Sequence, residues 1–482
     1  MSTLTAVSNT ARAADRGSGA ALAVLIGAYL LIAVDATVVN VALPALQRQL
    51  HFSPAALAWV PNAYALTFGG LLLLGSRLGD RLGRRRAFTA GVALFTLASL
   101  LGGLAPNAPL LLAARAVQGV GAALSTPNVL ALIATTFAEG RARNRALSLY
   151  SSAAGLGASL GMLLGGALTS WLSWRWALLV NVPIGLAVAL AAPRVVREPE
   201  RHPGGYDAAG ALTGTLGTTA LVYGVLRAAD HGWGDGPALG SMIAAGVLLI
   251  GFLLAELRVR EPLLPLELLR DRARTGAYLN MLLIPLAMFP SFFLLTLLFQ
   301  DVMHFSAVRT GLAFLPMTLV LFATVRLMPR LLPRTGTRPV LVAGALLLLL
   351  GALWLTRFPE HADYWAWVFG PLVLIGLGGG MSFMPMSVLV LTGVAPARSG
   401  SAAGLLQTLQ WTGGTIGTSV LVTVFSTAGR HAGGGPEHRL VHGMDAAFAV
   451  ASGVAAAALL VALLVIRAPR AQRQKVRPKV AR

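Results

Sequence analysis

The sequence contains no cysteine, and its only two lysines, Lys475 and Lys479, lie near the end of its 482 residues. Without cysteine the chain has no disulfide, no thiol nucleophile and no thiolate ligand for a metal. Because no lysine lies elsewhere, a phosphate-binding loop ending in Lys-Ser or Lys-Thr is impossible, which excludes an ATPase of the ATP-binding-cassette type on this chain. Charged residues are also scarce, at 12%, whereas 56% of residues are hydrophobic and the mean hydropathy is +0.72. This composition excludes an ordinary water-soluble enzyme and indicates a protein that lies within a membrane.

Long apolar runs fill most of the chain. A helix needs about 20 apolar residues to cross about 30 Å of hydrocarbon with its backbone hydrogen bonds satisfied. We count fourteen such runs and predict an all-α integral membrane protein with 14 transmembrane helices. The first run lacks a small-residue cleavage site and is interpreted as a retained helix. The predicted spans are 20–43, 56–76, 87–105, 108–132, 146–170, 174–193, 208–228, 237–256, 276–299, 309–328, 338–357, 364–391, 402–427 and 444–466.

The net charge of +20 comes mainly from arginines in the short breaks between these runs. With an even number of helices both termini lie on one side, and most basic residues fall on that side. The positive-inside rule therefore predicts that both termini are cytoplasmic. Since topology explains the arginines, we expect no nucleic-acid partner, although the basic tail 467–482 could attract anionic lipid or RNA as an accessory property. The arginine-, alanine- and glycine-rich composition suggests a bacterial cytoplasmic (inner or plasma) membrane.

Two cytoplasmic loops resemble each other at a constant offset of 253 residues. Helices 1–6 would then correspond to helices 9–14, giving two parallel six-helix repeats plus an inserted pair, helices 7 and 8, as in known secondary transporters. The aligned positions are Arg77, Leu78, Arg81, Gly83, Arg85, Arg145, Ser148 and Gly161 with Arg330, Leu331, Arg334, Gly336, Arg338, Arg398, Ser401 and Gly414. The predicted regions are an N-terminal tail (1–19), a first bundle (20–193), the inserted pair with its linkers (194–275), a second bundle (276–466) and a basic tail (467–482).

Asp35 is the one acidic residue that we place deep inside an apolar run. An ionisable group at that depth costs at least about 2.5 kcal/mol on insertion scales and usually has a function and a partner. Arg115 in the fourth run shares its depth, and Gln118 and Asn40 add hydrogen-bonding groups nearby. Burial favours the neutral carboxyl and Arg115 favours the charged one, so small movements could load and unload a proton. The alternative is a static ion pair that fixes helix 1 to helix 4. Glu256 lies at the end of a run and is interpreted as solvated.

A short basic turn, residues 76–86 (SRLGDRLGRRR), joins the second and third runs. Its glycines permit close packing and positive φ angles, and its aspartate can accept hydrogen bonds from a helix N-terminus or an arginine. We predict a charged clasp that holds one conformation and releases in another; the alternative is simple positive-inside anchoring. The clasp residues are Gly79, Asp80, Arg81, Gly83, Arg84 and Arg85.

This turn resembles the loop signature of the major facilitator superfamily. Residues 34–44 (VDATVVNVALP) are similar to the first-helix motif of its fourteen-helix drug:proton antiporter branch of multidrug efflux transporters. Arg115, Gln118, Gly119, Gly121, Ala122 and Ala123 resemble the family's fourth-helix pattern, in which the arginine is implicated in proton coupling. Gly157, Gly161, Gly165 and Gly166 resemble its fifth-helix antiporter pattern, followed by Trp174-Arg175-Trp176 and Asn181-Val182-Pro183.

The resemblance implies a proton-coupled drug exporter that works by alternating access without any cofactor or metal. Three positions depart from the pattern. Ser76 stands where the loop usually begins with glycine, and Met162 replaces the proline expected after Gly161, which weakens the predicted kink and the inference of strict antiport. In the second-half loop, Pro333 takes the place of Asp80, so the clasp would be one-sided.

The substrate path is expected between the two bundles. The side chains predicted to line it offer a broad apolar and aromatic surface with a few amides, which suits neutral or singly charged lipophilic molecules. Each of them could instead serve ordinary helix packing. The candidates are Asn40, Tyr64, Asn128, Met162, Asn280, Met281, Phe289, Phe383, Met384, Gln407, Gln410 and Trp411.

Three other functions stay open. The chain could export one endogenous metabolite, antibiotic or siderophore, because residue types do not set substrate breadth. A proton-linked importer is disfavoured by the glycines of the fifth helix. A membrane enzyme or receptor is disfavoured because the sequence has no HExxH motif and no Ser-His-Asp group at one depth. We expect the partners to be a small lipophilic molecule, protons and the lipid bilayer, and the chain to be a monomer.

Overall fold

The computed structural model describes residues 2–137, 141–199, 208–257, 271–359, 363–392, 394, 396–433 and 435–466. Within these ranges every regular element is helical and no strand occurs. Each of the fourteen predicted runs is mostly helical, and ten helical segments are long and apolar enough to cross a membrane. The described chain is therefore all-helical, while the number of crossings stays a prediction. The C-terminal tail, most of the linkers around the predicted inserted pair and the side chains of residues 2–18 lie outside the described part.

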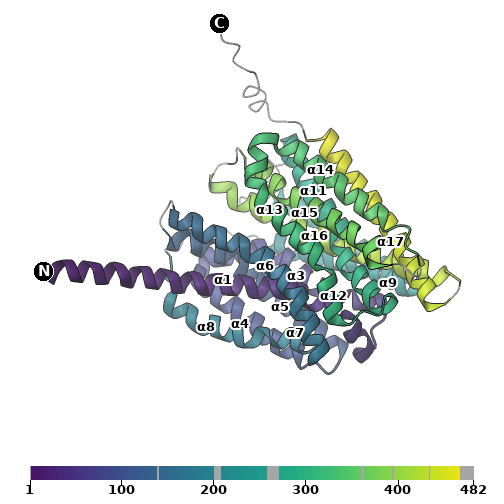
Figure 1. Cartoon of the computed structure of the whole chain (residues 1–482), viewed down its shortest axis with the longest axis horizontal. Coiled ribbons are helices and arrows are strands. Elements are labelled where there is room, and N and C mark those ends of the chain that lie inside the picture. The colour runs from purple at the N-terminus through teal and green to yellow at the C-terminus, as the bar shows by residue number, and fades with distance from the viewer. Residues whose placement is uncertain are drawn as a thin grey trace, which may run out of the picture.

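The first bundle is built from the N-terminal helices (Figure 1). Local signals set several boundaries: Asn107 caps one helix by accepting a hydrogen bond from the Leu110 amide, and Gly83, with φ of 106°, separates two others. The elements are α1 (Ser2–Leu50), α2 (Pro54–Leu57), α3 (Trp59–Leu82), α4 (Arg84–Gly103), α5 (Ala108–Thr136), α6 (Arg141–Trp171), α7 (Trp176–Leu179) and α8 (Asn181–Val195).

The second bundle lies beside the first and is built from the C-terminal helices (Figure 1). Its elements are α11 (Arg272–Leu297), the π-helix η2 (Leu298–Val302), α12 (Ala307–Ala313), α13 (Leu315–Thr335), α14 (Thr337–Trp354), the π-helix η3 (Trp365–Phe369), α15 (Gly370–Leu391), α16 (Pro396–His431) and α17 (Pro436–Leu464).

Corresponding helices pack together in the two bundles. In the first, α1 packs on α6, α3 and α4 on α5, and α4 on α8; in the second, α11 packs on α16, α13 and α14 on α15, and α14 on α17. Gly83 and Gly336 both have positive φ angles, 106° and 82°, at matching helix junctions. The arginine two positions after each glycine makes a similar contact in each half: Arg85 donates to the carbonyls of Pro193 and Val196, and Arg338 donates to that of Leu463. Both arginines thus hold the end of the last helix of their bundle.

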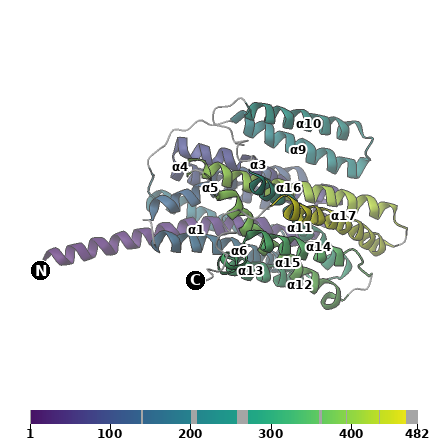
Figure 2. The same cartoon turned by 90° about the horizontal axis from the view of Figure 1, so that it is seen from above.

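Two further helices, α9 (Ala208–His231) and α10 (Gly236–Glu256), form a hairpin beside the bundles (Figure 2). On α10 the large apolar side chains of Ile243, Val247 and Ile250 are exposed, as expected for a surface that faces lipid. The interpretation of Glu256 as a solvated carboxylate is wrong, because only 3% of this residue is exposed. Its burial could not be read from its place at the end of an apolar run.

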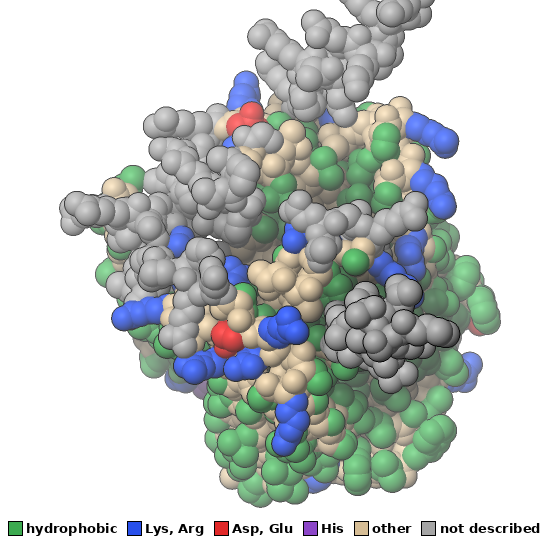
Figure 3. Space-filling view, turned by 90° about the vertical axis from the view of Figure 1, so that its left-hand side faces the viewer, with side chains coloured by type: hydrophobic (Ala, Val, Ile, Leu, Met, Phe, Trp, Pro, Cys, Tyr) green, Lys and Arg blue, Asp and Glu red, His purple; other side chains and the backbone are tan. Residues whose placement is uncertain are grey.

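Basic side chains gather at the end of the molecule from which α1 projects. Figure 3 looks onto this end and shows Lys and Arg side chains across it, with mainly hydrophobic side chains on the flanks below. We call it the proximal end and the opposite one the distal end.

Hydrogen bonds between the bundles lie midway along the helices and toward the distal end. At mid-depth, Thr408 donates to the Gly69 carbonyl over 3.1 Å. Farther toward the distal end, Asn62 donates to Ser419 over 2.9 Å. Near that end Gln300 of η2 donates to the Val41 carbonyl over 2.8 Å. These contacts hold the bundles together from the middle of the molecule outward to the distal end.

Candidate functional site

A buried ion pair lies at the centre of the first bundle. The guanidinium Nη1 of Arg115 on α5 lies 2.7 Å from Oδ2 of Asp35 on α1. Their side chains are 1% and 0% exposed. The sequence placed both residues at one depth, and the structure brings them into direct contact. Because removing either partner would strand a charge away from water, the pair strongly constrains how α1 and α5 can move.

Gln118 closes a ring of hydrogen bonds around this pair. Its Oε1 accepts from Arg115 over 2.9 Å, and its Nε2 donates to Asp35 Oδ1 over 3.2 Å and to Ser99 Oγ over 2.7 Å. Arg115 also donates through Nε to the carbonyl of Val60 over 3.1 Å. The network therefore joins α1, α3, α4 and α5. Ser99 and Val60 were missed from the sequence, since serines are common in apolar helices and a backbone carbonyl carries no signal.

Asn181 is the third donor to Asp35 and was quoted from the sequence only as part of a motif. Its Nδ2 lies 2.7 Å from Asp35 Oδ1, and the residue is fully buried at the start of α8. Its Oδ1 has no hydrogen-bond partner within the described structure. The sequence shows an amide near an apolar run, but Asn181 is far from Asp35 along the chain, so their contact could not be predicted.

Tyr64 connects the ion pair to an aromatic cluster between the bundles. The Arg115 guanidinium lies 4.5 Å from the Tyr64 ring centroid, which adds a cation–π contact. Trp411 of α16 packs edge-on against Tyr64, Phe68 and Phe289, with ring centroids 6.2, 4.9 and 5.8 Å apart. The Tyr64 hydroxyl is buried without a hydrogen-bond partner among the described residues. Thus a side chain of the second bundle reaches the layer next to Arg115.

The other predicted cavity residues divide by burial. Asn128, Met162, Asn280 and Met281 are almost fully buried. Asn128 donates to the carbonyls of Gly75 and Leu124, which ties α5 to α3. Neither side-chain amide atom of Asn280 has a hydrogen-bond partner in the described part. Asn40, which is 9% exposed, bonds back to Ala36 in its own helix. The partly exposed candidates are Phe289, Phe383, Met384, Gln407, Gln410 and Trp411.

The fifth-helix glycines allow α6 to lie directly against its neighbours. A methyl group at Gly157, Gly161 or Gly165 would collide with α1, whereas one at Gly166 would collide with Ala307 of α12. The helix α6 runs without interruption from Arg141 to Trp171 through the position of Met162. These glycines therefore form two contact surfaces, one within the first bundle and one toward the second.

The basic turn is held by two ion pairs. Asp80 and Arg84 lie 2.6 Å apart, and Arg85 lies 3.6 Å from Glu198. Glu198 Oε1 also accepts from the Arg85 amide over 3.0 Å, so a residue just beyond α8 caps the start of α4. Gly79 packs against Asn128, and Arg81 is exposed. Glu198 was missed because acidic residues in loops are usually solvated.

Comparison with known proteins identifies the family. A model of the Major Facilitator Superfamily matches residues 25–418. The chain belongs to this superfamily. The cephamycin export protein CmcT of Amycolatopsis lactamdurans is 40% identical to this chain over 96% of both chains. The puromycin resistance protein pur8 of Streptomyces alboniger is 41% identical over 90% of this chain and 88% of its own.

A solved structure supports the superfamily fold at low sequence identity. The peptide transporter POT, as a mutant in complex with alafosfalin, superposes with a TM-score of 0.67 and 16% identity. The match covers 92% of this chain and 93% of that one. This superfamily member is therefore a multi-pass membrane transporter whose relatives export, or confer resistance to, antibiotics.

Proposed function

We propose that this transporter exports lipophilic neutral or monocationic antibiotics across the bacterial cytoplasmic membrane in exchange for protons. The observation that carries the proposal is the single carboxylate, Asp35, buried at the centre of the first bundle with three side-chain donors around it. In this topology both termini and the proximal end are cytoplasmic, the chain crosses the membrane fourteen times, and α9 and α10 are the pair inserted between two six-helix repeats.

The network around Asp35 can stabilise both protonation states. When Asp35 is ionised, it accepts from Arg115, Gln118 and Asn181. When it is protonated, Arg115 keeps the Gln118 and Val60 oxygens and the face of Tyr64 as neutral partners. These partners lessen the penalty of a buried unpaired guanidinium. An ion pair with only a static structural role would not need these additional partners for Arg115.

Proton loading can then be linked to movement of the bundles. A proton arriving from outside neutralises Asp35 and weakens its hold on Arg115. The Arg115 guanidinium lies against the ring of Tyr64, and that ring packs against Trp411 of the second bundle. Substrate leaves outward at this stage, and release of the proton to the cytoplasm resets the site. One proton moving down 100 mV supplies about 2.3 kcal/mol, which suffices for an approximately fiftyfold gradient of a neutral compound.

A narrow exporter of one antibiotic is the second candidate. It is favoured by two relatives that are each named for one kind of antibiotic, cephamycin and puromycin. Buried amides such as Asn280, with its unpartnered polar atoms, could select one substrate by hydrogen bonding. A panel of antibiotics and dyes assayed for accumulation, with and without the transporter, separates the two candidates by the number of compounds exported.

The test of proton coupling is transport in proteoliposomes under an imposed pH gradient. The wild-type chain should drive uphill substrate movement and release protons in exchange, whereas Asp35→Asn should carry substrate only downhill or not at all. Gradient-driven exchange that is unaltered in Asp35→Asn would remove Asp35 from the coupling role.

A further inference from the structure

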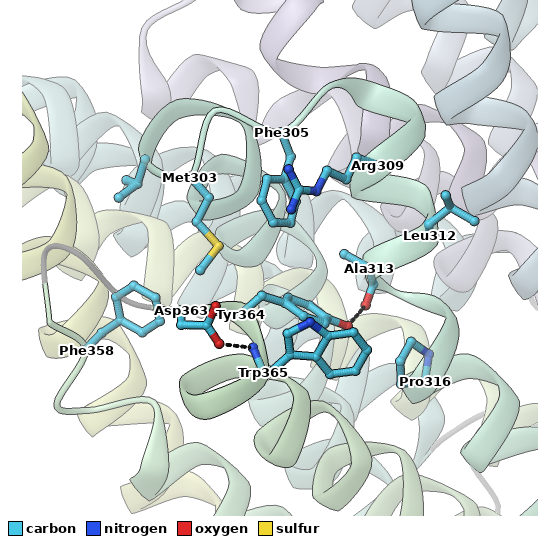
Figure 4. Close-up of a pocket in the computed structure, with 11 residues that line it drawn as sticks. Met303, Phe305, Arg309, Leu312, Ala313, Pro316, Phe358, Asp363, Tyr364 and Trp365 are labelled. Carbon is cyan, nitrogen blue, oxygen red and sulfur yellow. Dashed lines mark hydrogen bonds between the residues drawn. The ribbon is translucent and has the colours of Figure 1, made fainter.

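A separate cavity of about 480 Å³ lies at the distal end of the second bundle (Figure 4). It opens between η2, α12 and η3, far from Asp35 along the helices. Cavities of about 300–1,000 Å³ hold small organic ligands. Its walls carry Met303, Phe305, Arg309, Asp363, Tyr364 and Trp365.

Irregular backbone surrounds this cavity. The two π-helical segments in the described part of the chain, η2 and η3, both border it. Between η2 and α12, His304 has a positive φ of 54°, which is uncommon for a residue other than glycine. Such irregularities often mark functional sites, because regular helices would pack more simply.

One aromatic wall of the cavity is held by a hydrogen bond. The Tyr364 hydroxyl donates to the Ala313 carbonyl over 2.8 Å. Trp365 stands edge-on to the Tyr364 ring, with centroids 5.3 Å apart, and is 70% exposed. A ligand ring could therefore pack against Tyr364 without first ordering that side chain, and against the accessible indole of Trp365.

Opposite charges lie on the two sides of Tyr364 (Figure 4). The Arg309 guanidinium lies 3.9 Å from the Phe305 ring centroid. On the other side, Asp363 Oδ1 accepts from the amides of Trp365 and Ala366 over 2.9 and 3.2 Å. Within the described structure, Oδ2 of Asp363 accepts no hydrogen bond and no ion pair joins Asp363 to Arg309. A carboxylate beside an exposed indole and a phenol ring favours a cation.

We propose that this distal cavity binds aromatic amines carrying one positive charge. The positively charged nitrogen would lie at Asp363 and the aromatic rings against Tyr364 and Trp365. A hydrogen-bond acceptor, in compounds that carry one, would face Arg309. The inference rests on the proposed function only for its orientation, which places this end outside the cell. Exported compounds would meet the cavity after leaving the path between the bundles.

The absence of cysteine from the chain makes the cavity directly testable. Leu312 lines the cavity and is 49% exposed, so Leu312→Cys introduces a single thiol there. Intact cells are treated with a membrane-impermeant maleimide while the concentration of ethidium, an aromatic monocation, is raised. We expect ethidium to slow labelling about tenfold, and we expect Asp363→Asn added to Leu312→Cys to remove most of this protection. Asparagine keeps the oxygen that caps η3, so the wall should stay intact.

Trp233→Cys provides the matched control at an exposed position of the α9–α10 connection. Its labelling should not respond to ethidium. Protection of Leu312→Cys that persists with Asp363→Asn, or no protection at all, overturns the cavity proposal. A third outcome is that neither thiol is labelled in intact cells, whereas in purified protein both are labelled and ethidium protects Leu312→Cys. That result would overturn only the orientation. Proton-coupled export unaffected by Asp35→Asn would overturn the proposed function and leave the cavity result standing.

Discussion

The centres of the two bundles differ in chemistry although their helices pack alike. At the 253-residue spacing, Asp35, Arg115 and Gln118 correspond to Met288, Val368 and Pro371, all of them buried. One bundle therefore holds an ionic network where the other holds apolar side chains. Under the proposed function, proton exchange needs only the first bundle. The second bundle has apolar side chains at these positions and, at its distal end, the cavity around Tyr364.

The largest difference between the halves is expected in transport. Asp35→Asn should abolish proton-driven exchange, because an amide cannot gain and lose a proton at this site. Met288→Leu at the corresponding position should keep it, since swaps that conserve volume usually alter stability by less than about 1.5 kcal/mol. Both are measured by substrate uptake into proteoliposomes with and without a pH gradient. Equal rates for the two variants would contradict the assignment of the proton site to the first bundle.

The buried arginine should dominate the stability of the first bundle. Arg115→Ala leaves the Asp35 carboxylate uncompensated and should lower the free energy of unfolding by about 3–5 kcal/mol. Combining it with Asp35→Asn should recover part of this loss, because the uncompensated charge disappears. Thermal unfolding in detergent measures all three variants. Strictly additive losses would argue that the pair contributes no coupling.

Gly161 in the first bundle should tolerate an added methyl group less well than Gly414, the position 253 residues later in the second bundle. A methyl group at Gly161 would lie 2.6 Å from the backbone oxygen of Val34, whereas one at Gly414 would meet the ring of Phe289. A side chain can turn away more easily than a helix backbone, so Gly161→Ala should cost about 1–3 kcal/mol and Gly414→Ala less. Gly246→Ala, with no atom within 4 Å of the added carbon, is the control for both. The melting temperature should decrease most for Gly161→Ala, less for Gly414→Ala and least for Gly246→Ala.

The smallest effect is expected for an ion pair that faces water. Arg227 lies 2.6 Å from Asp235 in the α9–α10 hairpin, and this hydrogen bond lowers the pKa of Asp235. Because the pKa of Asp235 is lower in the folded state, its carboxylate stabilises the fold at pH values above the unfolded-state pKa of about 3.9. This stabilisation is lost as the pH falls through the folded-state pKa. Asp235→Asn should therefore shift the melting temperature slightly at pH 7, and the shift should shrink below about pH 4. A shift as large as that of Arg115→Ala would erase the contrast between buried and exposed pairs.

The helical segments could be predicted from the sequence because apolar runs must be long enough to span a bilayer. The depth of Asp35 and Arg115 followed from counting residues along two runs. The glycines of α6 were recognised in the sequence only as part of a family motif, and their close contacts with α1 and α12 are seen only in the structure. Glu256 was interpreted wrongly because its position along a run was visible in the sequence, whereas its burial was not.

By itself, the sequence determined that this chain lies in a membrane as helices and that Asp35 lies deep inside one of them, since hydropathy and charge can be read along the chain. Only the tertiary structure decided that Ser99, Asn181 and the Val60 carbonyl complete the network, and that Asp363 and Arg309 flank one cavity. Those contacts depend on the rotation of each helix about its own axis and on the angles at which neighbouring helices cross it. The rotation is set by packing among all the helices together, and no single segment encodes it.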